Sequence, residues 1–160
     1  MPTSGSTTGG ASFPFHLQLL TSIGCAAIWW IVTLGLLIFK ALYLPFPPAA
    51  LPMEVVASFL VLLVNAFGVF IGMRGNKMES TSAIVISAVL LSIAAVGAIY
   101  YMWLQTYVLM MDLAFSATYL GINGVAILLG FWATQSVARL AQVPVFKLEV
   151  ESGRSEKKKN

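Results

Sequence analysis

The side chains that most often carry out catalysis are sparse and isolated in this sequence. His16 is the one histidine, and no aspartate or cysteine lies near it. Cys25 is the one cysteine, which excludes a disulfide framework and the cysteine pairs of a quinone-linked thiol oxidase. The sequence has no metal-ligand spacing, nucleophile motif or glycine-rich phosphate loop. We therefore interpret His16 as an interfacial side chain, expect no cofactor or metal, and regard an enzyme as the least favoured class.

Lys40 and Glu54 are the charged residues that could serve proton or ion transport, because a charge at bilayer depth is costly and often functional. Lys40 lies about one turn from the end of an apolar run, so its long side chain can reach the membrane surface. Glu54 opens the next apolar run, where a carboxylate suits a helix N-terminus. We expect a structural pairing of Lys40 with Glu54 across the proline-rich segment between them.

Neutral polar residues within the apolar runs define an alternative function, that of a small transporter or channel subunit. Asn65, Gln105 and Asn123 are the deepest of these residues. The alternative predicts that they line one wet cavity together with Lys40 and Glu54. Ion pumps usually bury several ionisable groups, so the sequence favours the structural interpretation.

The composition indicates that the chain folds inside a membrane. Hydrophobic residues make up 59% of the 160 residues, and charged residues make up 9%. A soluble domain carries about a quarter charged residues, so this chain could not cover its surface in water. Backbone groups in lipid must bond internally, which favours helices. We predict an all-α fold, a polytopic bundle of four transmembrane helices with short loops.

Four apolar runs are each long enough to cross the bilayer, which takes about 20 helical residues. They cover residues 17–43, 53–73, 81–109 and 113–140, within a membrane domain of residues 16–141. Residues 1–15 are expected to be a disordered N-terminus, and residues 142–160 a largely disordered basic tail with a short extended stretch at its start. The first run is read as a retained span because no basic region precedes it.

Basic residues predict the orientation. Eight of the nine Lys and Arg residues lie in the second connection, as Arg74 and Lys77, or at and after the end of the fourth run. With four spans, these segments and the N-terminus share one membrane face, which the positive-inside rule makes cytosolic. Lys40, Glu54 and Asp112 belong to the opposite face.

Small residues indicate close helix packing. Gly68 and Gly72 form a GxxxG spacing, which lets helix backbones approach, but the spacing does not separate packing within the chain from binding of a partner. Trp29 and Trp30 are expected to pack against other helices or lipid. The tail ends in Lys157, Lys158, Lys159 and Asn160, a basic run suited to anionic lipid that also resembles a dilysine retrieval signal for the endoplasmic reticulum.

Five short motifs occur in a particular order. Residues 40–47 read KALYLPFP, Glu54 opens the second run, and Arg74, Gly75 and Asn76 follow that run. Residues 104–109 read LQTYVL near the end of the third run, and Asp112 lies just beyond. This order resembles the family containing transmembrane proteins 17, 80 and 216, with the 216-like subgroup nearest. The matching positions include Lys40, Leu44, Pro45, Pro47, Glu54, Arg74, Gly75, Asn76, Gln105, Thr106 and Tyr107.

The resemblance implies a non-enzymatic membrane component of the ciliary transition zone that supports cilium assembly and a membrane diffusion barrier. It also implies partners among other transition-zone membrane proteins of the tectonic-like and Meckel module, besides membrane lipid. Homo- and hetero-oligomers both stay open, and no nucleic-acid partner is expected. The implied location is the ciliary base. A tetraspan protein of the endoplasmic reticulum or vesicles stays open as an alternative.

Overall fold

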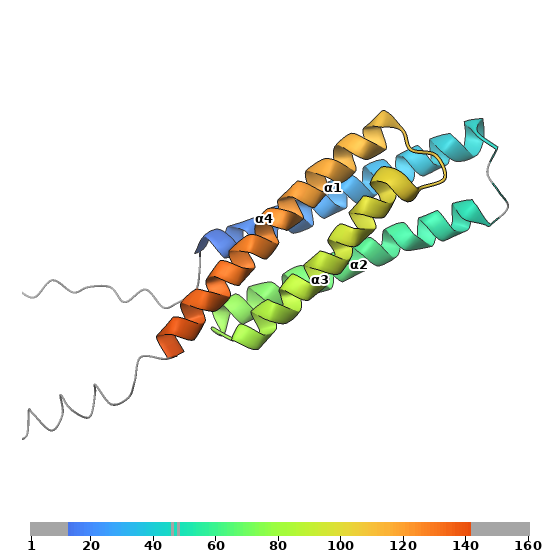
Figure 1. The fold of residues 1–160 in the computed structure, drawn as a ribbon. Helices are drawn as coiled ribbons and strands as arrows, with labels where there is room; N and C mark the ends of the chain where they lie inside the picture. Colours follow the sequence, from blue (N-terminus) through green and yellow to red (C-terminus); the bar gives the residue numbers. More distant parts are fainter. Residues whose placement is uncertain (1–12, 46, 48, 142–160) are drawn as a thin grey trace, which may run out of the picture.

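The computed structural model describes residues 13–45, 47 and 49–141, and it leaves the side chains of residues 137 and 139–141 undescribed. It contains four α-helices: α1 (Phe13–Tyr43), α2 (Ala50–Lys77), α3 (Thr81–Ile99) and α4 (Met110–Ala141). A short π-helix, η1 (Tyr100–Leu104), continues α3 (Figure 1). The predicted all-α, four-helix fold is confirmed. Phe46 and the segments 1–12 and 142–160, including the basic tail, lie outside the described residues.

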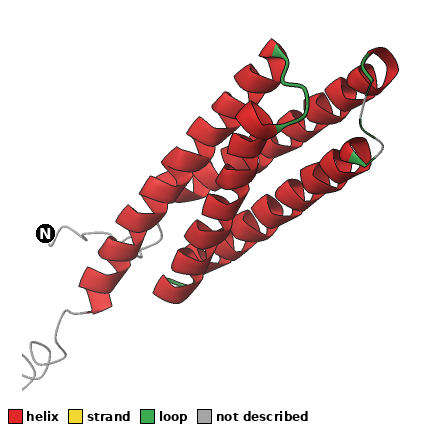
Figure 2. Ribbon diagram, turned by 45° about the vertical axis from the view of Figure 1, so that its right-hand side comes forward, coloured by secondary structure: helices red, strands yellow, loops and turns green. Residues whose placement is uncertain are grey.

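The helices run up and down in chain order. Each helix packs on the next one along the chain, and α1 also packs on α4 to close the bundle (Figure 2). The beginning of α1, the end of α4 and the α2–α3 turn lie at one end, which we call the terminal end (Figure 1). The connections 44–49 and 105–109 lie at the other end, which we call the connection end.

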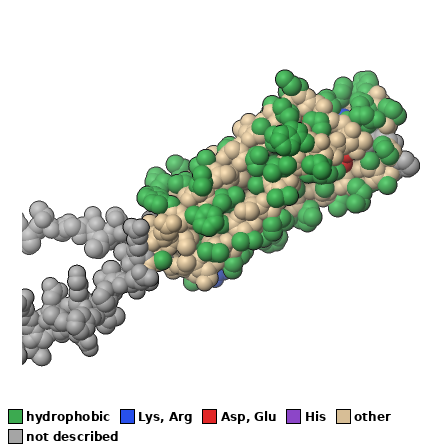
Figure 3. Space-filling view, viewed as in Figure 1, with side chains coloured by type: hydrophobic (Ala, Val, Ile, Leu, Met, Phe, Trp, Pro, Cys, Tyr) green, Lys and Arg blue, Asp and Glu red, His purple; other side chains and the backbone are tan. Residues whose placement is uncertain are grey.

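The bundle is more apolar outside than inside. Large hydrophobic side chains such as Phe67, Leu128 and Trp132 are exposed, whereas Ser22, Asn65 and Asn123 are fully buried. Hydrophobic side chains extend along the visible face, and charged ones are seen only near its two ends (Figure 3). The shortest candidate span, Thr81–Leu104, has 24 residues. At about 1.5 Å per residue, this length crosses the roughly 30 Å of hydrocarbon. The molecule is therefore built for lipid as its solvent.

Two predicted boundaries are wrong. The third span was expected to reach Leu109, but its helix ends at Leu104, where the Gln105 N–H bonds the Tyr100 carbonyl at 3.1 Å in a π-type turn. The sequence alone does not reveal this end, because Val108 and Leu109 resume the apolar run after the polar residues Gln105 and Thr106. The Arg74–Asn76 motif was expected in a loop, but it forms the last turn of α2, which ends at Lys77.

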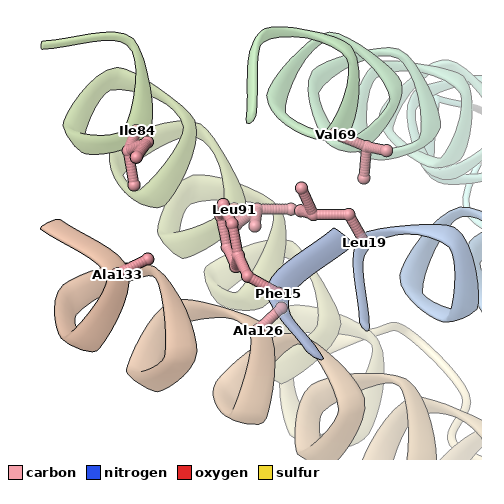
Figure 4. Packing of buried hydrophobic residues seen from close by; sticks show 7 residues of the cluster. All are labelled: Phe15, Leu19, Val69, Ile84, Leu91, Ala126 and Ala133. Atoms are coloured by element: carbon pink, nitrogen blue, oxygen red, sulfur yellow. The ribbon is translucent and has the colours of Figure 1, made fainter. Parts of the chain in front are cut away.

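The core near the terminal end is built from all four helices. Figure 4 shows Phe15 and Leu19 of α1 meeting Val69 of α2 and Leu91 of α3, with small alanines contributed by α4. A second buried cluster, centred on Trp29, lies further along α1. Trp29 thus packs against other helices, and Trp30 is only partly buried and packs edge-on against Phe59 at 4.9 Å between ring centroids.

Gly68 and Gly72 face α3 within the chain. The Ser87 hydroxyl donates to the Gly68 carbonyl at 2.7 Å. A Cβ added at Gly68 would lie 3.1 Å from Leu90 Cβ, and one added at Gly72 would collide with Ser87. Both glycines are buried by this contact, so the GxxxG spacing serves packing between α2 and α3 and is not displayed to a partner.

Candidate functional site

Lys40 is fully buried although it lies in the last turn of α1. Its ammonium group pairs with the Asp112 carboxylate at 2.5 Å, and it also donates to Gln105 Oε1 at 3.0 Å. The expectation that this side chain reaches the membrane surface is therefore wrong. A lysine this close to the helix end could extend outward, but two buried acceptors hold it inside the bundle.

Asp112 also caps the N-terminus of α4. Its Oδ2 accepts a hydrogen bond from the Leu109 N–H at 3.1 Å, and Leu109 precedes the first helical residue. A side chain at the third helical position that reaches back to the N-cap amide forms half of a capping box. Asp112 therefore fixes the start of α4 and neutralises Lys40 with the same carboxylate.

Glu54 is equally buried, with 1% of its surface exposed, but it does not pair directly with Lys40. Its carboxylate accepts from Gln105 Nε2 at 2.9 Å and from the Thr106 backbone N–H at 2.9 Å. The Tyr101 hydroxyl donates to the Glu54 backbone carbonyl. The predicted Lys40–Glu54 pair is thus wrong in detail, because Gln105 stands between the two charges.

Gln105 joins the two halves because its amide accepts from Lys40 and donates to Glu54. The result is one buried chain of contacts, which we call the ionic network: Asp112, Lys40, Gln105 and Glu54. It connects α1, α2, α4 and the 105–109 connection. Breaking a buried ion pair leaves an uncompensated charge, so such a network holds these segments in one arrangement.

The π-helix η1 positions Gln105 in this network. A π-turn adds a residue to the helical turn, and such turns often lie at functional sites. Here η1 ends α3 so that the Gln105 side chain and the Thr106 amide both point to Glu54. The next residue, Tyr107, donates through its hydroxyl to the Pro45 carbonyl at 2.8 Å, which ties the two connections together.

Sequence reasoning missed the role of Asp112, although a signal was present. Lys40, Glu54 and Asp112 were assigned to the same membrane face on chain topology, and they are the charged residues at that end of the described spans. One cation between two carboxylates predicts pairing. Glu54 was chosen as the partner because it is nearer to Lys40 along the chain. In the structure Lys40 pairs with the more distant Asp112.

The deeper polar residues form a separate cluster. Asn123 Nδ2 donates to Asn65 Oδ1 at 3.1 Å, and the Ser22 hydroxyl donates to Asn123 Oδ1 at 2.5 Å. An aromatic layer lies between this cluster and the ionic network: Trp29 stacks on Tyr119 at 5.0 Å between ring centroids and meets Tyr101 edge-on at 5.2 Å. The single wet cavity expected of a transporter is therefore not formed by the five residues named for it.

The remaining motif residues lie at both ends of the bundle. Leu44 is half-buried, and Pro45 and Pro47 are exposed in the first connection. At the terminal end, Arg74 is exposed whereas Gly75 and Asn76 are buried. A Cβ on Gly75 would lie 2.7 Å from Ala83 Cβ, so this position has no room for a side chain. Among the described residues, no group of three His, Cys, Asp or Glu side chains could hold a metal ion.

Comparison with known proteins extends the assignment. A family model named Transmemb_17, described as a predicted membrane protein, matches residues 17–123. The chain belongs to the Transmemb_17 family. The matched region contains the whole ionic network and the hydrogen-bonded residues Asn65 and Asn123. The C-terminal half of α4 and the tail fall outside it.

Curated relatives in this family carry the name transmembrane protein 216. The protein of Bos taurus is 34% identical over 119 residues, which is 74% of this chain and 84% of the relative. The protein of Homo sapiens is 30% identical over 130 residues, which is 81% of this chain and 90% of the relative. No solved structure matches the chain significantly. Both the family description and the names of these relatives identify membrane proteins.

Proposed function

We propose that the protein is a non-enzymatic membrane component of the ciliary transition zone, where it supports cilium assembly and the membrane diffusion barrier. Membership of the Transmemb_17 family carries the proposal, since the match includes every residue of the ionic network. The resemblance to transmembrane proteins 17, 80 and 216 supplies the ciliary role. The separation of the deep polar residues into two clusters disfavours the transporter alternative.

The mechanism we propose is that of a rigid intramembrane building block. The ionic network and the Tyr107–Pro45 hydrogen bond hold one end together, and α2–α3 glycine packing fixes the other end. Polar side chains that bond inside the bundle leave an outer surface for apolar contact with lipid and with helices of other proteins. Exposed side chains on α4, such as Leu128 and Trp132, offer such contact area. Barrier function would follow from assembly of these faces, without any chemical step.

The proposed orientation has both termini in the cytosol. Arg74 and Lys77 lie at the terminal end, where α1 begins and α4 ends. At the connection end the basic residue Lys40 is buried and paired with Asp112, so it is not a free charge on that face. Basic residues concentrate on the cytosolic face of membrane proteins, which favours this orientation.

Co-purification tests the proposed partners. The chain, tagged at its N-terminus, is expressed in ciliated cells and isolated in mild detergent beside an equally expressed, unrelated four-span protein. We expect tectonic-like and Meckel-module membrane proteins to be enriched with this chain over that control. The Lys40→Met variant, which disturbs the bundle from inside, should recover less of them. Equal recovery with the unrelated protein would contradict the partner assignment.

A further inference from the structure

A pocket at the terminal end has a chemistry that the ciliary proposal does not use. It lies between the first turn of α1 and the last turns of α2, with a volume of about 370 Å³. Its lining residues are His16, Phe70, Met73, Arg74 and Lys77. Two helices from distant parts of the sequence thus bring three basic side chains around an apolar floor.

Within the part of the chain that the structure describes, no carboxylate neutralises the charges of this pocket. Arg74 and Lys77 are exposed and form no ion pair with any residue that the structure describes. The nearest carboxylate in sequence, Glu79, belongs to the α2–α3 turn and does not line the pocket. A guanidinium and an ammonium group that line one pocket suit a phosphate, which Arg can bind through two parallel hydrogen bonds.

The apolar part of the pocket lies deeper along the bundle than its basic part. Phe70 is one helical turn deeper than Arg74 along α2, and 65% of its surface is exposed. Met73 lines the pocket between these two levels. A ligand that satisfies both parts of the pocket therefore needs a negative headgroup joined to an apolar chain. A phospholipid in the membrane leaflet presents these two parts at this depth.

We propose that this pocket binds one anionic phospholipid. Arg74 and Lys77 contact its phosphate and acidic headgroup, His16 donates a further hydrogen bond, and Phe70 with Met73 contacts the first part of an acyl chain. The site is independent of the ciliary role, because it requires only that the bundle sits in a membrane containing such lipid. If the termini are cytosolic, the site faces the leaflet that holds anionic lipid.

Native mass spectrometry of the full chain tests the site directly. The purified protein, in a neutral detergent, is mixed with equal amounts of phosphatidylserine and phosphatidylcholine of matched chain length, and singly bound lipid is counted. We expect phosphatidylserine to be preferred, and the double variant Arg74→Gln with Lys77→Gln to lower that preference about tenfold, because each basic side chain near an anionic headgroup contributes several-fold.

Three controls decide the interpretation. The double variant Lys157→Gln with Lys158→Gln removes the same charge from the tail, and it should retain the preference. Free glycerophosphoserine, a headgroup without chains, should not displace the bound lipid. Helical circular dichroism should be unchanged in both double variants, since the substituted pocket side chains are exposed. The site is overturned if the intact chain shows no preference for phosphatidylserine. It is also overturned if the tail variant loses that preference while the pocket variant keeps it.

Discussion

Lys40 and Asp112 form a buried ion pair, so each compensates the charge of the other inside the bundle. Both side chains are almost fully buried, with 0% and 2% exposed, and each has a further hydrogen-bonding partner. A buried ion pair costs desolvation energy, so its presence is not in itself a gain in stability. We infer that its value lies in the arrangement it selects, because a packing that separated Lys40 from Asp112 would leave two buried charges uncompensated.

Substitution of one member of the pair should therefore be far more damaging than substitution of both. We expect Lys40→Met or Asp112→Asn alone to lower the free energy of unfolding by about 3–5 kcal/mol, since each leaves a buried charge without its partner. The combined variant should lose less than either single variant, because it leaves neither charge of the pair without its partner. Equilibrium unfolding in mixed detergent micelles, followed by circular dichroism, measures all three.

Glu79→Gln provides the matched control for charge removal, because Glu79 is exposed in the α2–α3 turn. Its effect on unfolding should be too small to resolve. Single Lys40 and Asp112 variants that behave like this control would contradict the role of the buried pair.

The sequence allowed part of this network to be predicted. From the sequence, Lys40 and Glu54 were assigned to the same membrane face, and a structural role was expected for both. The sequence could not show that Gln105 lies between them, because that position depends on a π-turn created by tertiary contacts. The expectation that Lys40 reaches the membrane surface failed for another reason: the sequence of one helix does not indicate which of its faces meets a buried carboxylate.

Helix α2 and helix α3 form the closest pair of elements. Three glycines of α2 allow this approach: a Cβ would collide with α3 at Gly72 and Gly75 and would crowd it at Gly68. Small residues allow helices to approach in lipid, where packing and not hydrophobic drive holds them together. The sequence indicated Gly68 and Gly72 through their spacing. It did not indicate that Gly75 belongs to the same surface, because its motif reads as a loop although it ends a helix.

Gly75→Ala should destabilise the α2–α3 pair. The new methyl group would lie 2.7 Å from Ala83 Cβ and 3.0 Å from the Ile84 backbone nitrogen, which cannot move aside as a flexible side chain would. Overpacking of this kind costs about 1–3 kcal/mol. The matched variant is Gly121→Ala on α4, where a Cβ meets nothing within 4 Å.

Thermal unfolding of these two glycine variants in detergent gives the comparison. Gly121→Ala should leave the midpoint unchanged or raise it, because alanine is the better helix former. Equal midpoints for the two variants would mean that the close approach at Gly75 is not a constraint on the fold.

The whole molecule is an apolar bundle whose two ends differ in chemistry. The connection end holds a closed network of buried charges, and the terminal end holds exposed basic residues. Composition and apolar runs sufficed to predict four helices and a membrane environment, because these properties follow from the solvent the surface must face. They did not locate the ends of the helices, which caps, turns and glycine contacts determine.

The orientation follows from this difference between the ends and can be measured in sealed microsomes with the cytosolic face outward. In a Cys25→Ala background, we expect a membrane-impermeant maleimide to label Met78→Cys, in the α2–α3 turn, without detergent. Pro47→Cys, in the exposed first connection, should react only after detergent opens the vesicles. The reverse pattern would place the termini on the non-cytosolic side.

The location of the full chain in ciliated cells tests the central claim most directly. The tag is placed ahead of an intact copy of the last four residues, which preserves the lysines of the tail, and the signal is imaged beside a basal-body marker and an axonemal marker. A narrow band between the two markers is the predicted result. A reticular distribution without a band at the ciliary base would contradict the transition-zone assignment and favour a tetraspan protein of the endoplasmic reticulum.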